Sequence, residues 1–115
     1  MTITRFDVGE RISRAVVHNG TVYLAGQATA EPVGDVAGQT AAVLEKIDAL
    51  LARCGTNKSR ILFAQIHLAD MSVFDAMNKA WVAWVPSLAQ PARTVVEARL
   101  PKSEFLVEIT VTAAT

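Results

Sequence analysis

The stretch "LVEITVTA", residues 106–113, alternates apolar and polar side chains along its length. A period of two residues is typical of a β-strand, because successive side chains point to opposite faces of a sheet. We therefore predict a strand over Leu106–Thr112. One of its faces is fully apolar and predicts a buried core; it carries Val107, Ile109, Val111 and Ala113. The other face is only half apolar and invites a second subunit; it carries Leu106, Glu108, Thr110 and Thr112.

Four other segments have the composition of strands. The runs Ala15–His18 and Thr21–Ala25 flank Asn19-Gly20, whose residues tolerate the positive φ of a type I′ turn, so they predict a hairpin. Ile61–Leu68 alternates, and Arg93–Ala98 contains two β-branched valines between prolines; both predict strands. Residues 26–38 hold three glycines, a proline and several small residues, and they predict a loop.

Two segments have the spacing of amphipathic helices. Apolar side chains recur at i, i+3, i+4 and i+7 from Val36 to Cys54, with Asp35 as the predicted N-cap and Gly55 as the C′ residue. A second stripe follows, for which we predict Ser72 as the N-cap and Pro86 just beyond the end. The element order β-β-α-β-α-β-β predicts an α/β (α+β) domain. Two helices suffice to cover one face of its sheet, so we expect an oligomer whose chemistry lies between chains.

The composition limits the class of protein. At 115 residues the chain is expected to form a single domain, residues 1–115, and its 51% hydrophobic content excludes a disordered chain. Eleven basic and eleven acidic residues cancel, which argues against nucleic acid or an anionic membrane as a partner. The single cysteine, the lack of a signal-peptide pattern and the lack of a long apolar run predict a cytoplasmic protein.

Few residues have the pattern of a chemical site. His18, His67 and Cys54 lack the spacing of metal ligands, and we expect satisfied histidines and a core cysteine. Arg93, near a strand start, presents a planar fork of donors that suits a carboxylate. Glu108 interrupts the polar face of the last strand with a potential base. If their strands lie close together, the two side chains offer an anion anchor and a general base. The alternative is a simple ion pair, or two solvated side chains.

Several blocks of the sequence resemble one known family. They are "GTVYLAGQ" (20–27), "QT" (39–40), "AQIHLADMSVFDAMNKAW" (64–81), "QPARTVVEARLP" (90–101) and "LVEITVTA" (106–113). Their order is similar to that of the Rid family, the reactive intermediate deaminases or YjgF-like proteins. The turn at residues 56–59 and the "AMNKAW" helix resemble its short YoaB-like branch.

This resemblance implies a chorismate-mutase-like fold, with two helices on one face of a mixed sheet, that assembles as a homotrimer with clefts between subunits. It also implies a cofactor-independent hydrolase. Active members convert short-lived enamines and imines, such as 2-aminoacrylate and its imine tautomer, to 2-keto acids and ammonia. By resemblance, Arg93 grips the substrate carboxylate and Glu108 activates the attacking water.

The N-terminal part of the site departs from the family pattern. Where active relatives carry a G-P-Y-S-Q-A-type segment, this chain has "ERISRA", residues 10–15, so that Ile12 replaces the tyrosine and Arg14 the glutamine. Ala25 stands in place of a serine before the loop glycine, Gly26. The resemblance implies that these four residues line the substrate site, and Arg14 is a candidate receptor for a second carboxylate. An alternative function is a non-catalytic trimer that binds small carboxylates between its subunits, and a protein-interaction role is a third.

Overall fold

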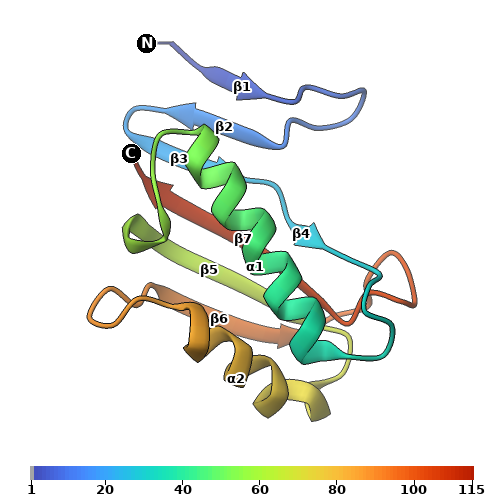
Figure 1. Cartoon of the computed structure of the whole chain (residues 1–115). Coiled ribbons are helices and arrows are strands. Elements are labelled where there is room, and N and C mark those ends of the chain that lie inside the picture. Colours follow the sequence, from blue (N-terminus) through green and yellow to red (C-terminus); the bar gives the residue numbers. More distant parts are fainter. Residues whose placement is uncertain (1) are drawn as a thin grey trace.

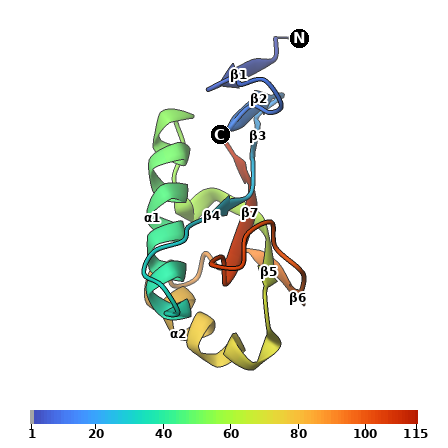
Figure 2. The same cartoon turned by 90° about the vertical axis from the view of Figure 1, so that its right-hand side faces the viewer.

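The computed structural model describes residues 2–115 and shows one sheet with both helices on the same side (Figures 1 and 2). The helices are α1 (Val36–Arg53) and α2 (Phe74–Trp84), and two short 3-10 turns are η1 (Lys58–Arg60) and η2 (Met71–Val73). The strands are β1 (Thr4–Phe6), β2 (Ala15–His18), β3 (Thr21–Leu24), β4 (Gln27–Ala28), β5 (Ile61–Leu68), β6 (Ala92–Glu97) and β7 (Val107–Ala114). The predicted α/β arrangement is confirmed, with β1 and β4 as additional short strands.

The sheet is mixed and runs in the order β1-β2-β3-β7-β5-β6, while β4 pairs with the other end of β7 beyond β3. All strand pairs are antiparallel except β5 and β6. A parallel pair needs a crossover connection, and α2 supplies it. The last strand of the sequence therefore lies in the middle of the sheet, between β3 and β5.

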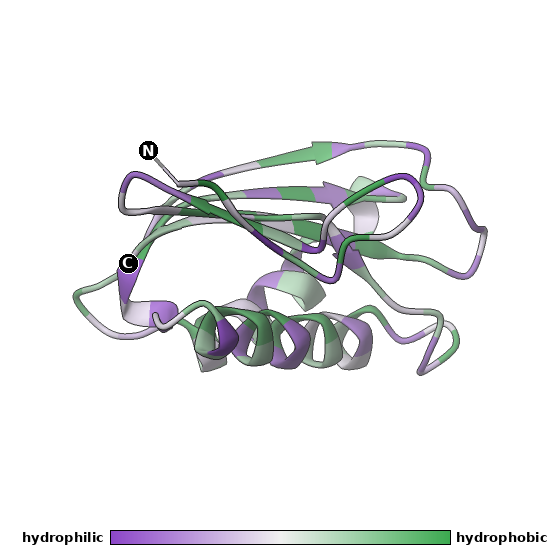
Figure 3. Cartoon of the chain, turned by 90° about the horizontal axis from the view of Figure 1, so that it is seen from above, coloured by the Kyte–Doolittle hydropathy of each residue, from purple (hydrophilic) through white to green (hydrophobic). Residues whose placement is uncertain are grey.

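The core lies between the sheet and the helices. Along β7 the odd-numbered residues 107–113 are buried and the even-numbered ones are partly exposed, as the alternation predicts. The buried face of α1 packs on them; it includes Val43, Leu44, Ile47 and Leu51. The molecule measures 43 × 38 × 20 Å, so it is a plate of two layers. Figure 3 views this plate along the sheet, with the helices on one side of the sheet and no helix on the other.

Local sequence signals explain the element ends. Asn19 and Gly20 have φ of 52° and 77°, as a type I′ hairpin turn requires. Asp35 caps α1, because its Oδ1 accepts a hydrogen bond from Gly38 N at 2.9 Å. Gly55 has a φ of 78° just after α1, which is the left-handed conformation that glycine adopts readily. These three predictions are confirmed.

Two local predictions were wrong. The expected loop at 26–38 begins with β4, whose two residues pair with Ile109 and Glu108 and are too few to show an alternation. Ser72 is not the N-cap of α2, because the helix is preceded by the turn η2. There the Asp70 side chain accepts a hydrogen bond from Ser72 N at 2.8 Å, so the capping side chain lies one turn earlier.

The face of the sheet opposite the helices remains open. Large side chains on it are partly exposed in one chain, among them Tyr23, Phe63 and Val96. The strand register places these residues on the same side as Thr112 and His67, away from the core. Within residues 2–115, neither helix is long and apolar enough to cross a membrane.

Candidate functional site

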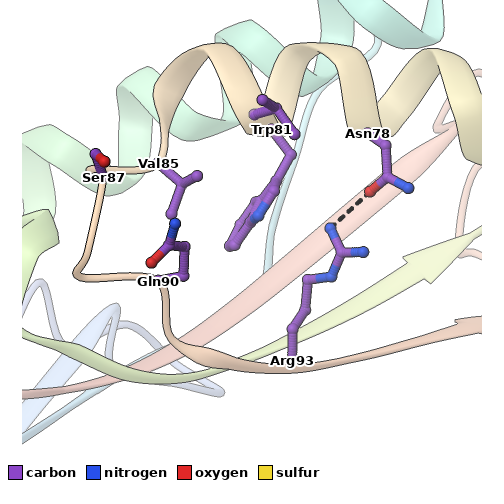
Figure 4. Close-up of a pocket in the computed structure, with 7 residues that line it drawn as sticks. Asn78, Trp81, Val85, Ser87, Gln90 and Arg93 are labelled. Carbon is purple, nitrogen blue, oxygen red and sulfur yellow. Dashed lines mark hydrogen bonds between the residues drawn. The ribbon is translucent and has the colours of Figure 1, made fainter.

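Arg93 lies on β6 and points toward α2. Its neighbour in the register is Ala64, a fully buried residue of the helix-covered face. Arg93 Nη1 donates a hydrogen bond to Asn78 Oδ1 at 2.7 Å, and its guanidinium carbon lies 5.3 Å from the centre of the Trp81 ring (Figure 4). This distance permits a cation–π contact. The planar guanidinium is thus oriented from two sides by one helix.

A pocket of about 500 Å³ lies beside this arginine, and we call it the Arg93 pocket. It is lined by Asn78, Trp81, Val82, Val85, Ser87, Gln90 and Arg93 (Figure 4). Partial burial lowers the pKa of the Arg93 guanidinium. An arginine nevertheless stays protonated at neutral pH, because its ordinary pKa is far higher. Asn78 occupies one of its N–H donors, and other donors of the fork are available for a carboxylate.

Glu108 lies on β7 and points to the open face. Its register partner is His67 on β5, whose Nδ1 lies 3.2 Å from Glu108 Oε1. The backbone of Gly26 lies against the other side of the Glu108 side chain. A Cβ at that position would lie 2.9 Å from Glu108 Cδ and 3.1 Å from Thr110 Oγ1. Only glycine fits there without displacing the carboxylate. His67 and Gly26 thus border the Glu108 side chain on two sides.

A second pocket, of about 250 Å³, opens beside Glu108, and we call it the Glu108 pocket. It is lined by Ile12, Arg14, Ala25, Gly26, Gln27, Ala28, Lys46, Phe105 and Glu108. The bend between β3 and β4 forms one wall. Ala25 N donates to Arg14 O at 2.9 Å, and Gln27 Nε2 donates to Ala25 O at 2.9 Å, so backbone and amide bonds fix this bend.

The structure brings five of the six sequence-predicted site residues together and separates the sixth. Ile12, Arg14, Ala25, Gly26 and Glu108 line the Glu108 pocket, whereas Arg93 lines its own. β6 and β7 flank β5 from opposite sides, and the two side chains point to opposite faces of the sheet. Within one chain, the expected pairing of the arginine with the glutamate is therefore wrong. Within one chain, Arg93 and Glu108 also form no ion pair, and Glu108 lies beside His67 instead.

Other residues of the two pockets were not identified from the sequence. Asn78 belongs to a helix whose pattern shows only an apolar stripe, and its contact with Arg93 depends on how α2 crosses β6. Trp81 is buried and lies 5.5 Å from Trp84, as expected for a packed helix face, but it also supports the arginine. His67 was expected to be a satisfied strand histidine, and its partner is Glu108. The register of β5 and β7 decides that contact.

A metal-type cluster is not part of either pocket: no three His, Cys, Asp or Glu side chains within residues 2–115 are grouped to hold a metal ion. The chemistry available at the two pockets is thus that of an arginine fork, a carboxylate with a histidine neighbour, and two further cations, Arg14 and Lys46.

Comparison with known proteins places this chain among small proteins of one family. The family model described as endoribonuclease L-PSP matches residues 2–115. The RutC family protein YoaB of Escherichia coli K12 is 46% identical over 114 residues, which is 99% of each chain. The 3-aminoacrylate deaminase RutC of Acinetobacter baylyi is 36% identical over 77 residues, or 67% of this chain and 60% of that protein.

A solved structure agrees in sequence and fold. NMB1025 of Neisseria meningitidis, a member of the YjgF protein family, is 44% identical and superposes with a TM-score of 0.96, covering 100% of this chain and 96% of that one. The family resemblance inferred from the sequence blocks is therefore confirmed. The match of the family model over the described chain and the full-length likeness to YoaB show that this protein belongs to the endoribonuclease L-PSP family, also called the YjgF or Rid family.

Proposed function

We propose that this protein hydrolyses reactive 2-imino acids, and the enamines from which they form, to 2-keto acids and ammonia. The observation that carries the proposal is the pair of half-sites: an oriented arginine fork in one pocket and a fixed carboxylate at the mouth of another. A family relative named as a 3-aminoacrylate deaminase supports the related deamination of an enamine.

The complete site forms between two copies of the chain. Arg93 faces the helix side at one edge of the sheet, and Glu108 faces the open side. One chain cannot present both groups to a small substrate, but a neighbouring copy docked in a ring can bring its Arg93 pocket to the Glu108 pocket of the first. The homotrimer implied by the sequence resemblance is such a ring. It adopts the cleft-between-subunits arrangement expected from the open sheet face.

In the proposed reaction, Arg93 binds the α-carboxylate and Glu108 accepts a proton from water. The water oxygen forms a bond to the C=N carbon, and the π electron pair moves to nitrogen, which gives a carbinolamine. Glu108 then returns the proton to the amine. The C–N bond then breaks with its electron pair on nitrogen, and the C=O bond forms as Glu108 takes the hydroxyl proton and passes it to the departing ammonia. The protonated imine and water thus become keto acid and ammonium. An enamine substrate first gains a proton on carbon and becomes the imine.

No cofactor is needed for this reaction, since a protonated imine is already electrophilic. The contribution of the protein is position and proton transfer. A non-catalytic module that binds small carboxylates would need the arginine alone. The carboxylate held beside His67 and under Gly26 favours the enzyme over that alternative.

The first test measures ammonia and keto-acid release from 2-aminoacrylate generated in situ by a serine dehydratase. Loss of a charge-assisted contact in Arg93→Ala should cost about 2–3 kcal/mol, or roughly a 30- to 150-fold lower kcat/KM. Glu108→Gln should bind keto acids and lose turnover. Arg60→Ala is the matched control, because Arg60 lies on η1 and donates to the Thr115 carbonyl. A wild-type rate equal to the uncatalysed rate, with keto acid still bound, would make the protein a binding module.

A mixing experiment tests whether the site is shared. Arg93→Ala and Glu108→Gln chains, each inactive, are unfolded together at equal amounts and refolded. If each site takes its arginine and glutamate from different copies, random assembly restores roughly one quarter of the wild-type activity, because each group is intact in half of the positions. Activity no higher than that of the separate variants would show that the two groups do not work across an interface.

A further inference from the structure

Two cations of the Glu108 pocket lack an acidic partner and take no part in the reaction proposed above. Arg14 comes from the segment before β2, and Lys46 comes from the exposed side of α1. In the described chain, no carboxylate lies within 4 Å of either side chain as an ion pair. The only acid that lines the same pocket is Glu108, which contacts His67. The pocket thus has an excess of positive charge.

The nearby acid Asp7 is bonded mainly to Arg53, and the charge of Arg14 contributes less than Arg53 to the lowered pKa of Asp7. Both of its carboxylate oxygens bind Arg53, at 2.6 and 3.0 Å, and this contact holds the pKa of Asp7 below its ordinary value. Asp7 and Arg53 line an adjoining pocket together with Arg14 and Lys46. Because Arg53 already compensates Asp7, the charges of Arg14 and Lys46 remain available to a ligand.

Both cationic residues line the pocket of the proposed base, and hydrogen bonds connect their segments to the strand beside it. The Arg14 carbonyl accepts from Ala25 N, and the next residue, Gly26, lies against the Glu108 carboxyl group. Lys46 Nζ donates to the Ala28 carbonyl at 2.9 Å, and Ala28 is the register partner of Glu108. Arg14 and Lys46 therefore line the Glu108 pocket from the segment before β2 and from α1.

From this arrangement we infer that Arg14 and Lys46 form an anionic subsite for a second carboxylate, so that the preferred ligands are dicarboxylic 2-imino acids and their 2-keto products. This inference rests on the proposed function for the position of the first carboxylate, at Arg93 of a neighbouring copy. The second carboxylate would meet a planar arginine fork and a lysine, and apolar Ile12 and Phe105 line the same pocket beside them.

Binding of stable keto acids tests the subsite without any turnover. Titration calorimetry compares 2-oxoglutarate with 2-oxohexanoate, a chain of similar length that ends in a methyl group. The wild-type protein should bind the diacid about tenfold more tightly, the factor expected for one charge-assisted contact. The ratio of the two affinities should fall to about one in Arg14→Gln with Lys46→Met, and it should fall as salt is raised.

Arg11→Gln is the matched control, because it removes a positive charge from the same segment at a residue that does not line the pocket. Its affinity ratio should equal that of the wild type. An equal affinity of the wild-type protein for both acids would overturn the subsite, and so would an unchanged ratio in the double variant. Circular dichroism of each variant verifies the fold.

The imine assay separates this inference from the proposed function. Imines are generated from glutamate and from norleucine by an amino-acid oxidase with catalase present. Hydrolysis of both imines at equal efficiency would support the proposed deaminase function and overturn the proposed preference for diacids. Diacid-selective binding that depends on Arg14, with no hydrolysis of any imine, would support the subsite and overturn the deaminase.

Discussion

At the scale of single residues, the candidate site depends on how closely two side chains and one glycine are fitted together. Glu108 has His67 on one side and the bare backbone of Gly26 on the other. The residue types at Arg93 and Glu108 were identified from the sequence, because a charged side chain in a strand pattern stands out. Their relation was not, because the face on which each side chain lies depends on the strand register.

Gly26→Ala tests the fit around the carboxylate. The new methyl group would lie 2.9 Å from Glu108 Cδ, closer than carbon atoms approach, so the carboxylate must turn away. We expect kcat for imine hydrolysis to fall at least about tenfold, because even a small misplacement of a reacting group lowers the rate by that factor or more. The melting temperature should change little, since a flexible side chain yields rather than the backbone.

The control for this change is Gly9→Ala. An added Cβ at Gly9 meets only the Ile12 carbonyl at 3.6 Å, which is an ordinary contact. If Gly26→Ala keeps full activity, Glu108 does not need its present position, and its role as the base is contradicted.

At the scale of elements, sequence signals located most helices and strands, and the exceptions have physical reasons. Capping, glycine and alternation patterns are local, so they identified α1, the β2–β3 hairpin and β7. β1 has three residues and β4 two, and segments so short show no period. Both are defined by their partners on β2 and β7. Elements that exist through long-range pairing alone are not visible in a local pattern.

Gln39, in α1, makes long-range hydrogen bonds of this kind. Its fully buried amide Nε2 donates to the carbonyls of Pro32 and Glu104, both at 3.0 Å, and its Oε1 accepts from Leu106 N at 3.0 Å. The start of α1 is thereby joined to the loop before it and to the segment that enters β7. The sequence pattern marked this glutamine only as part of a family block.

Gln39→Leu should therefore destabilise the protein strongly. The change removes three hydrogen bonds made by a fully buried amide, at a cost of about 2–4 kcal/mol in the free energy of unfolding. Urea denaturation followed by circular dichroism measures it. Gln65→Leu, on the open face, is the control and should change the free energy of unfolding by less than about 0.5 kcal/mol. Equal stability of both variants would contradict the structural role of the Gln39 amide.

At the scale of the whole molecule, the plate is only two layers thick and one side of its sheet is bare. Tyr23, Phe63 and Val96 are 50%, 38% and 39% exposed there, which is costly for side chains of this size. The single covered face was predictable from two helical stripes. The copy that we propose to cover the open face lies outside one chain, so its geometry follows neither from the sequence pattern nor from the fold of one chain.

Phe63→Lys should weaken the assembly of copies. A lysine on the open face would have to lose its water in the interface without an acidic partner. We expect sedimentation velocity at micromolar concentration to show an oligomer for the wild type and mainly monomer for the variant, with imine hydrolysis lost in parallel. Val33→Lys changes an exposed residue of the loop before α1 and should keep the oligomer. A monomeric wild-type protein would contradict the shared site.

The alternation of β7 has a consequence for how this protein can change over generations. Its odd-numbered residues contact the helices, and its even-numbered residues, including Glu108, face the open side. Under the proposed function, one strand is therefore subject to two separate selective constraints: packing at every second position and chemistry at the positions between. Mutations on the open side of β7 can change which ligands bind without changing the core. Proteins that share this strand can therefore differ in specificity while they keep the same fold.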